Sequence, residues 1–166
     1  MSNAFVAILM GSDSDLPVLQ STIEVLKSLG IQHEVKITSA HRTPAATHAY
    51  VKDADGRGCA VYIAAAGLAA HLAGTVAGLT LKPVIGIPLD AGGLGGMDAL
   101  LSTVQMPGGI PVACVAIGKA GAKNAAYLAA QILATADESI AKRIASDREA
   151  NAKAVISKDA ELQSKL

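Results

Sequence analysis

Apolar residues gather along the chain in five short runs that are nearly continuous rather than alternating. They are rich in Val and Ile, a pattern typical of strands whose two faces are both covered by other elements. The predicted strands span residues 5–10, 33–37, 60–65, 83–87 and 111–117. We therefore expect a buried, parallel sheet.

Helical patterns separate these runs. Residues 16–30 carry an apolar stripe at helical spacing, and Gly30 is suited to the position just after a helix. A second helix is expected from Pro44, a favourable first residue, to about Gly56. Further helices are predicted at 69–79, 97–104 and 119–135.

This alternation predicts an α/β fold, a three-layer αβα sandwich around a parallel five-stranded sheet. The flavodoxin-like strand order 2-1-3-4-5 is the preferred choice. We expect one catalytic domain over residues 1–166, in which about 137–166 form a charged, C-terminal helical extension.

The composition narrows the class of protein. The chain is 51% hydrophobic and only 17% charged, against about 25% charged in ordinary domains. The apolar excess predicts burial between subunits of a homo-oligomer. A membrane span is excluded because no run of about 18 apolar residues is uninterrupted. The zero net charge and lack of a basic run argue against nucleic acid as a partner.

The two cysteines, Cys59 and Cys114, lie far apart without the spacing of a metal site, so we expect buried thiols. The N-terminus shows no leader pattern. A cytoplasmic location fits both observations.

Polar residues collect where four predicted strands end, in "GSDSD", "SAHRTP", "AAGLAAHLAG" and "PLDAGG". In a parallel sheet these ends share one edge, where open α/β folds bind ligands. Because four loops agree in position, we expect the functional site there.

The first loop, at residues 11–15, is suited to bind an anion. A glycine at a strand exit followed by a helix start offers backbone N–H groups, and Ser12 and Ser14 add hydroxyl donors. Asp15 would repel a phosphate and is better used to accept hydrogen bonds from ribose hydroxyls. The alternative is that Ser14 and Asp15 only cap the helix, and the pattern leaves both interpretations open.

The second loop places a titratable side chain beside a fixed cation. Arg42 can bind a phosphate, and His41 can transfer a proton near neutral pH. A structural role for His41 is the alternative, and it is the favoured interpretation for His33 and His48. His71, near a helix start, could line the site or cap its loop.

None of the four aromatic residues lies in these loops, which disfavours a flavin or purine stacked between aromatic rings. A small heterocycle held by backbone groups fits better. The candidate residues for this contact are Ser39, Ala40, Gly67, Ala70, His71 and Leu72. The residues alone thus predict a cofactor-free proton- or carboxyl-transfer enzyme acting on a sugar phosphate.

The motifs "MGSDSD", "SAHRTP", "AAHLAG", "STVQMPGGIPV" and "AIGKAGAKNAAYLAAQIL" closely resemble those of the catalytic subunits of phosphoribosylaminoimidazole carboxylase, the PurE family, class I-like. The resemblance covers residues 5–135. It implies an isomerase of purine biosynthesis that moves a carboxyl group from N5 to C4 of N5-carboxyaminoimidazole ribonucleotide. It also implies a flavodoxin-like cytoplasmic homo-octamer with no metal or organic cofactor.

By the same resemblance, Arg42 and the serines bind the phosphate, Asp15 binds the ribose and His41 is the general acid/base. The substrate loses CO2 and is then recarboxylated at C4. We expect the turn at 105–109, from this or a neighbouring subunit, to help close the site.

The chain departs from the family pattern after the third strand, where Leu68 replaces a glycine and Ala73 a proline. A leucine adopts positive φ less cheaply than glycine, so Leu68 puts the rate and the pocket shape in question. Residues 91–96 are also richer in glycine than usual.

Three alternatives stand beside the mutase. A sister class carboxylates aminoimidazole ribonucleotide directly, but it tends to carry Lys after the active-site histidine and Ser-Asn where this chain has Ala70 and His71. A non-catalytic flavodoxin-like nucleotide-binding module and a relative that has lost activity are the other two.

Overall fold

The computed structural model describes residues 4–166, and it contains a five-stranded, fully parallel sheet in the order β2-β1-β3-β4-β5. The strands are β1 (Phe5–Met10), β2 (His33–Ile37), β3 (Cys59–Gly67), β4 (Val84–Leu89) and β5 (Ala113–Cys114). The predicted fold class and strand order are confirmed.

The fifth strand is much shorter than the predicted 111–117. Only Ala113 and Cys114 pair with β4. Pro111 has no N–H to donate to a ladder, and Ala116 has φ 142, which takes the chain out of extended geometry. The apolar run therefore continues beyond the paired residues.

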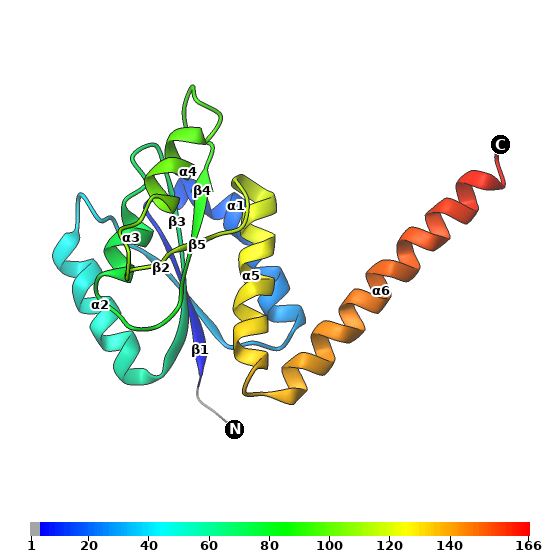
Figure 1. Cartoon of the computed structure of the whole chain (residues 1–166), viewed down its shortest axis with the longest axis horizontal. Helices are drawn as coiled ribbons and strands as arrows, with labels where there is room; N and C mark the ends of the chain where they lie inside the picture. Colours follow the sequence, from blue (N-terminus) through cyan, green and yellow to red (C-terminus); the bar gives the residue numbers. More distant parts are fainter. Residues whose placement is uncertain (1–3) are drawn as a thin grey trace.

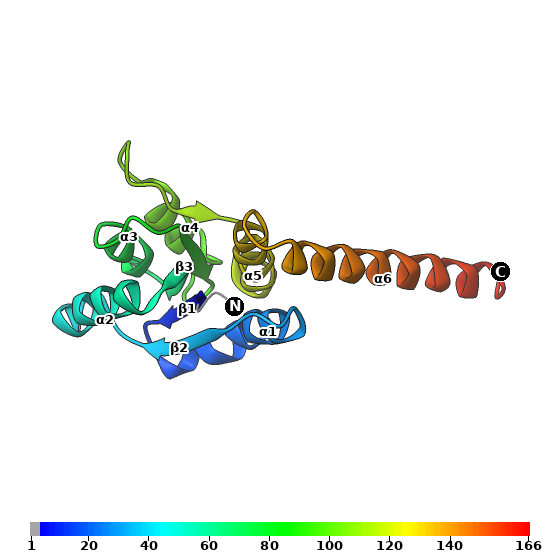
Figure 2. The same ribbon diagram turned by 90° about the horizontal axis from the view of Figure 1, so that it is seen from below.

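Helices cover both faces of the sheet (Figure 1). A short 3-10 turn, η1 (Asp13–Asp15), leads into α1 (Leu16–Ser28), and the other helices are α2 (Pro44–Arg57), α3 (Leu72–Ala77), α4 (Met97–Val104), α5 (Gly118–Ala134) and α6 (Glu138–Gln163). In Figure 2, α1 and α5 lie on one face, and α2, α3 and α4 on the other. Helix α3 is shorter than the predicted 69–79, because residues 69–71 belong to the loop that precedes it.

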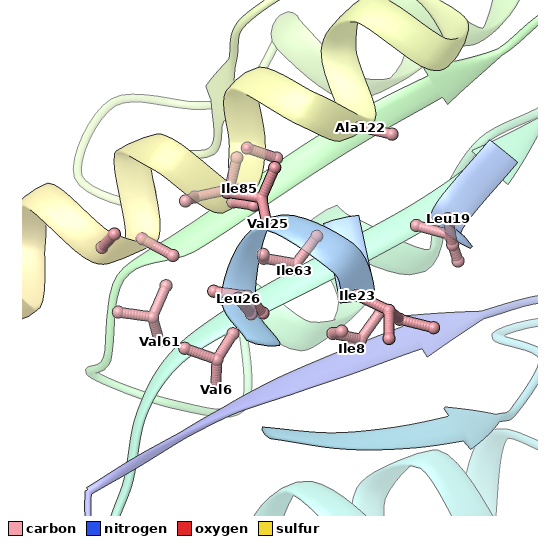
Figure 3. Close-up of a cluster of buried hydrophobic side chains, with 14 of the residues drawn as sticks. Val6, Ile8, Leu19, Ile23, Val25, Leu26, Val61, Ile63, Ile85 and Ala122 are labelled. Atoms are coloured by element: carbon pink, nitrogen blue, oxygen red, sulfur yellow. The ribbon is translucent and has the colours of Figure 1, made fainter. Parts of the chain in front are cut away.

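Alternate residues of each central strand point into two separate cores, which explains the continuous apolar runs. On one face, Val6 and Ile8 of β1 pack with Ile63 of β3 against α1 and α5 (Figure 3). On the other, Ala7 and Leu9 pack with α2 and α3. Both faces of the central strands are thus buried, whereas β2 at the edge of the sheet is partly exposed. The carboxyl ends of the strands remain available for a site.

Helix α6 begins on the body of the protein and then leaves it. Ile140 and Ile144 are buried, and Arg143 Nε donates a hydrogen bond to the carbonyl oxygen of Leu29 at 2.7 Å. Residues 148–166 are all exposed, and Figures 1 and 2 show this part of the helix projecting from the body. No helix among the described residues is long and apolar enough to cross a membrane.

Candidate active site

A cavity of about 440 Å³ opens at the carboxyl ends of the strands, beside the point where the chain order reverses between β1 and β3. All but one of the residues predicted for the site line it: Ser12, Ser14, Asp15, Ser39, Ala40, His41, Arg42, Gly67, His71 and Leu72. Ala70 is the exception, because it is only 1% exposed and does not line the cavity. The topology thus brings three loops, far apart in sequence, to one place.

The loop after β1 is held by its own side chains. Ser12 Oγ accepts a hydrogen bond from the N–H of Ser14 at 3.3 Å, and Asp15 Oδ2 accepts one from the N–H of Ser12 at 3.1 Å. This reciprocal pair is a capping box, so the capping interpretation is right for Asp15, with Ser12 rather than Ser14 as the cap. Both residues also lie on the cavity wall, where Ser12 Oγ donates a hydrogen bond to Asp13 Oδ1 at 3.0 Å and Ser14 Oγ donates one to Asp15 Oδ1 at 3.5 Å.

Arg42 reaches from the loop after β2 to the loop after β1. Its Nη2 donates to the carbonyl oxygen of Gly11 at 3.2 Å, and its backbone N–H donates to Ser39 Oγ at 3.1 Å. The guanidinium therefore lies beside the serine-rich turn while remaining exposed. Hydroxyl donors and a fixed positive charge in one corner suit an anion such as phosphate.

Three threonines that the sequence analysis did not single out hold the loop after β2. Thr38 Oγ1 and Thr47 Oγ1 lie 2.7 Å apart, and Thr43 Oγ1 accepts from the N–H of Ser39 at 2.9 Å. The sequence feature that could have indicated them is the occurrence of threonine at 38, 43 and 47, just after β2 and at the start of α2. They fix the backbone that carries His41 and Arg42.

His41 and His71 form a hydrogen-bonded pair across the cavity. Nε2 of His41 lies 2.7 Å from Nδ1 of His71, and the rings meet edge to face at 78°. In such a contact one ring donates and the other accepts, so the pair can pass a proton between its two members. This settles the place of His71: it lines the cavity. His48 is exposed on α2, and His33 bonds to the carbonyl oxygen of Ile31 at 2.9 Å, both outside the cavity.

Leu68 lies at the cavity wall with a positive φ of 55, which a leucine adopts less readily than a glycine does. This left-handed conformation costs a non-glycine residue about 1–2 kcal/mol. Gly11 and Ala69, which belong to the predicted loops, also line the cavity, as do Ala66 and Ala91, which were not named as candidates because an alanine side chain offers no polar group.

The cysteines lie outside the cavity. Burial raises the pKa of the Cys59 and Cys114 thiols, which keeps both uncharged at neutral pH. Cys59 is buried as expected, whereas Cys114 is only half-buried. Among residues 4–166, no group of three or more His, Cys, Asp or Glu side chains could hold a metal ion.

Fold and cavity together define a class: a flavodoxin-like α/β protein with a small-molecule site at the switch point of its sheet. Residues 5–154 match the family model described as AIR carboxylase. The chain belongs to this AIR carboxylase family.

Curated relatives and solved structures agree. The N5-carboxyaminoimidazole ribonucleotide mutase of Thermotoga maritima is 49% identical over 95% of this chain and 91% of its own. The mutase of Escherichia coli K12 is 49% identical over 92% and 90%, and that of Methanocaldococcus jannaschii 51% over 93% and 94%. The crystal structure of Treponema denticola PurE superimposes with a TM-score of 0.86 at 35% identity, covering 96% of this chain and 98% of that one.

Proposed function

We propose that this chain is an N5-carboxyaminoimidazole ribonucleotide mutase, an isomerase that produces 4-carboxy-5-aminoimidazole ribonucleotide in purine biosynthesis. The observation that carries the proposal is the name of its relatives, which are 49–51% identical over more than nine-tenths of the chain. The cavity supplies what this chemistry needs: an anion-binding corner, a carboxylate and a pair of imidazoles.

In this proposal the ribonucleotide phosphate lies in the corner formed by Arg42, Ser12 and Ser14. Asp15 Oδ1, which also accepts a long hydrogen bond from Ser14 Oγ at 3.5 Å, accepts hydrogen bonds from the ribose hydroxyls. The imidazole base then extends toward the loops after β2 and β3. Its expected contacts are Ser39, Ala40, Gly67, Ala70, His71 and Leu72, with Ala70 acting only through its backbone because its side chain is buried.

His41 serves both proton steps. In the first, the bond between N5 and the carboxyl carbon breaks, CO2 leaves, and His41 gives a proton to N5. In the second, C4 attacks the CO2, a carbon–carbon bond forms, and the proton on C4 passes to His41, which the first step left deprotonated. One imidazole can act in both directions because it donates a proton when protonated and accepts one when neutral. The 2.7 Å contact with His71 supports a shared proton during the cycle.

The second proposal concerns assembly and location. We propose a homo-oligomer, with an octamer as the form expected from the family, because α6 exposes apolar side chains that one copy leaves uncovered. None of the described residues 105–109 lines the cavity of its own chain, and Met106 packs beside Gly74 instead. If that turn closes a site, it closes a neighbour's. The two free thiols fit a reducing cytoplasm.

Direct carboxylation of aminoimidazole ribonucleotide is the second candidate, favoured by the description of the matching family as AIR carboxylase. Arg42 after His41, where the sister class tends to carry lysine, weighs against it.

An absorbance assay on the purified protein separates the two functions. One cuvette holds N5-carboxyaminoimidazole ribonucleotide, and the other holds aminoimidazole ribonucleotide with a modest concentration of bicarbonate. We expect rapid formation of the C4-carboxylated product in the first alone. Turnover in the second would establish the carboxylase, and no product in either would leave a binding protein.

A further inference from the structure

We propose that Leu68 is a positioning residue that holds the loop after β4 against the cavity and so retains CO2 between the two half-reactions. The inference rests on the proposed mutase function and deepens it. Nothing in that function requires a leucine at this position.

Leu68 occupies an unfavourable backbone conformation at an exposed place. Its φ of 55 is one that a leucine adopts only with strain, and its side chain is still 54% exposed. It therefore gains little from burial to offset the strain. A strained residue on the wall of a cavity is a reason to look for a function in that cavity.

The exposed side chain lies close to the glycine-rich segment at 90–96. A Cβ added to Gly92 would lie 2.7 Å from Leu68 Cδ2, so the leucine occupies the space that any larger residue at 92 would need. One residue earlier, a Cβ on Gly67 would lie 2.4 Å from the Cβ of Ala91. The two loops therefore touch along Gly67 and Leu68.

The segment that Leu68 touches needs such a contact. Gly92 and Gly93 carry no side chain to anchor it, and Gly95 and Gly96 adopt positive φ. Without contacts to hold it, a segment this rich in glycine can adopt many backbone conformations. Ala91 lines the cavity, so this segment forms part of the cavity wall.

The chemistry explains why an apolar wall matters. After the N5–carbon bond breaks, CO2 is neutral and offers no charge for Arg42 to bind. Only confinement away from water keeps it near C4. The apolar side chains of the cavity lining are those of Ala40, Ala66, Leu68, Ala69, Leu72 and Ala91. Leu68 is the member of this wall that also contacts the next loop.

Retention can be measured directly with substrate labelled in its carboxyl group, turned over in unlabelled bicarbonate. Label that escapes as CO2 exchanges with the pool, so the labelled fraction of the C4-carboxylated product reports retention. We expect Leu68→Gly to raise the escaping fraction about three- to tenfold. This is smaller than the roughly hundredfold cost of misplacing a reacting group. Leu68→Ala, which keeps a Cβ, should raise it as well.

Gly92→Ala tests the contact from its other side, because the new methyl group must displace the leucine. Its effect should equal that of Leu68→Gly, and the double variant should lose no more label than either single one. Leu94→Ala is the matched control, since this leucine lies in the same segment, is 67% exposed and does not line the cavity. It should retain label like the wild type.

A thermal unfolding midpoint of Leu68→Gly at or above that of the wild type is expected, because glycine relieves the strain. Wild-type retention in Leu68→Gly would overturn the inference while leaving the mutase intact, and so would equal escape in Leu94→Ala. A wild-type protein that forms no C4-carboxylated product would overturn both the inference and the proposed function.

Discussion

At the scale of single residues, two neighbours in the chain face different partners. His41 meets the imidazole of His71 at 2.7 Å, while Arg42 turns toward the carbonyl oxygen of Gly11 at 3.2 Å. The two side chains can therefore have different roles: His41 can exchange protons with the reacting base, and Arg42 can bind the phosphate. Substitution should separate these roles.

His41→Asn should lower turnover at least about 10²-fold and leave nucleotide affinity nearly unchanged, because an amide cannot exchange protons as imidazole does. Steady-state kinetics with calorimetric titration of the product measures both. His48→Asn, exposed on α2 and outside the cavity, is the control and should behave like the wild type. More than about a tenth of wild-type turnover in His41→Asn would contradict the assignment.

Arg42→Ala should weaken ligand binding first. A charge-assisted hydrogen bond contributes about 1.5–3 kcal/mol, which corresponds to a dissociation constant roughly ten- to hundredfold higher. Arg42→Lys should recover only part of the affinity, since an ammonium group lacks the planar fork of a guanidinium. Lys52→Ala, an exposed cation on α2, should bind normally, and an unchanged affinity in Arg42→Ala would place the phosphate elsewhere.

At the scale of elements, close approach between β4 and α4 depends on one small residue. A Cβ at Gly86 would lie 2.2 Å from Thr103 Cγ2, 3.1 Å from Val112 Cγ1 and 3.2 Å from the Cβ of Ala73. Strand and helix meet at a distance that only glycine permits. Since Ala91 follows β4, this packing also helps to position the cavity wall.

Gly86→Ala should therefore destabilise the protein by about 1–3 kcal/mol, the usual cost of overpacking a core. Urea unfolding at one fixed protein concentration measures it, because oligomers gain stability with concentration. Gly56→Ala is the matched control in helix α2, where an added Cβ meets nothing within 4 Å. It should stabilise by about 0.5–1 kcal/mol, because alanine is the better helix former. A neutral Gly86→Ala would show that α4 can move away from the sheet.

The boundaries of the helices and strands agree with the sequence patterns in some places and differ in others. Helix α4 lies at the predicted 97–104 because its apolar period and boundaries are local properties. Strand β5 is shorter than the apolar run at 111–117, because only Ala113 and Cys114 pair with β4. The positive φ of Ala116 takes the chain out of extended geometry beyond them. Residues 69–71 became loop rather than helix for a similar reason: they follow the left-handed Leu68.

At the scale of the whole molecule, the second half of α6 projects from the body and carries exposed apolar side chains. Val155, Ile156 and Leu162 are 67%, 69% and 53% exposed. Val155 and Leu162 lie two turns apart and so share one face of the helix. Apolar side chains at this spacing on a helix that projects into solvent suit contact with another copy.

The double substitution Val155→Glu with Ile156→Glu should shift the assembly to smaller species, because charges in an apolar interface are costly. Light scattering after size-exclusion chromatography measures the mass, and Lys158→Glu on the same exposed stretch is the control. Far-ultraviolet circular dichroism should show the fold retained. An unchanged mass in the double variant would exclude this face from the interface.

The sequence by itself determined the fold class and the four loops that could carry a site, and it favoured the strand order that only the structure fixed. These follow from local periodicity and from a rule of parallel sheets, that strand ends share one edge. It also identified His41 and Arg42, because imidazole and guanidinium have distinctive chemistry. Only the tertiary structure paired His41 with His71, made Ser12 and Asp15 a capping box, buried Ala70 and seated Leu68 against Gly92. Each of these depends on distances between segments that are far apart in the chain or on the dihedral angles of one turn, and neither is encoded in a pattern of residue types.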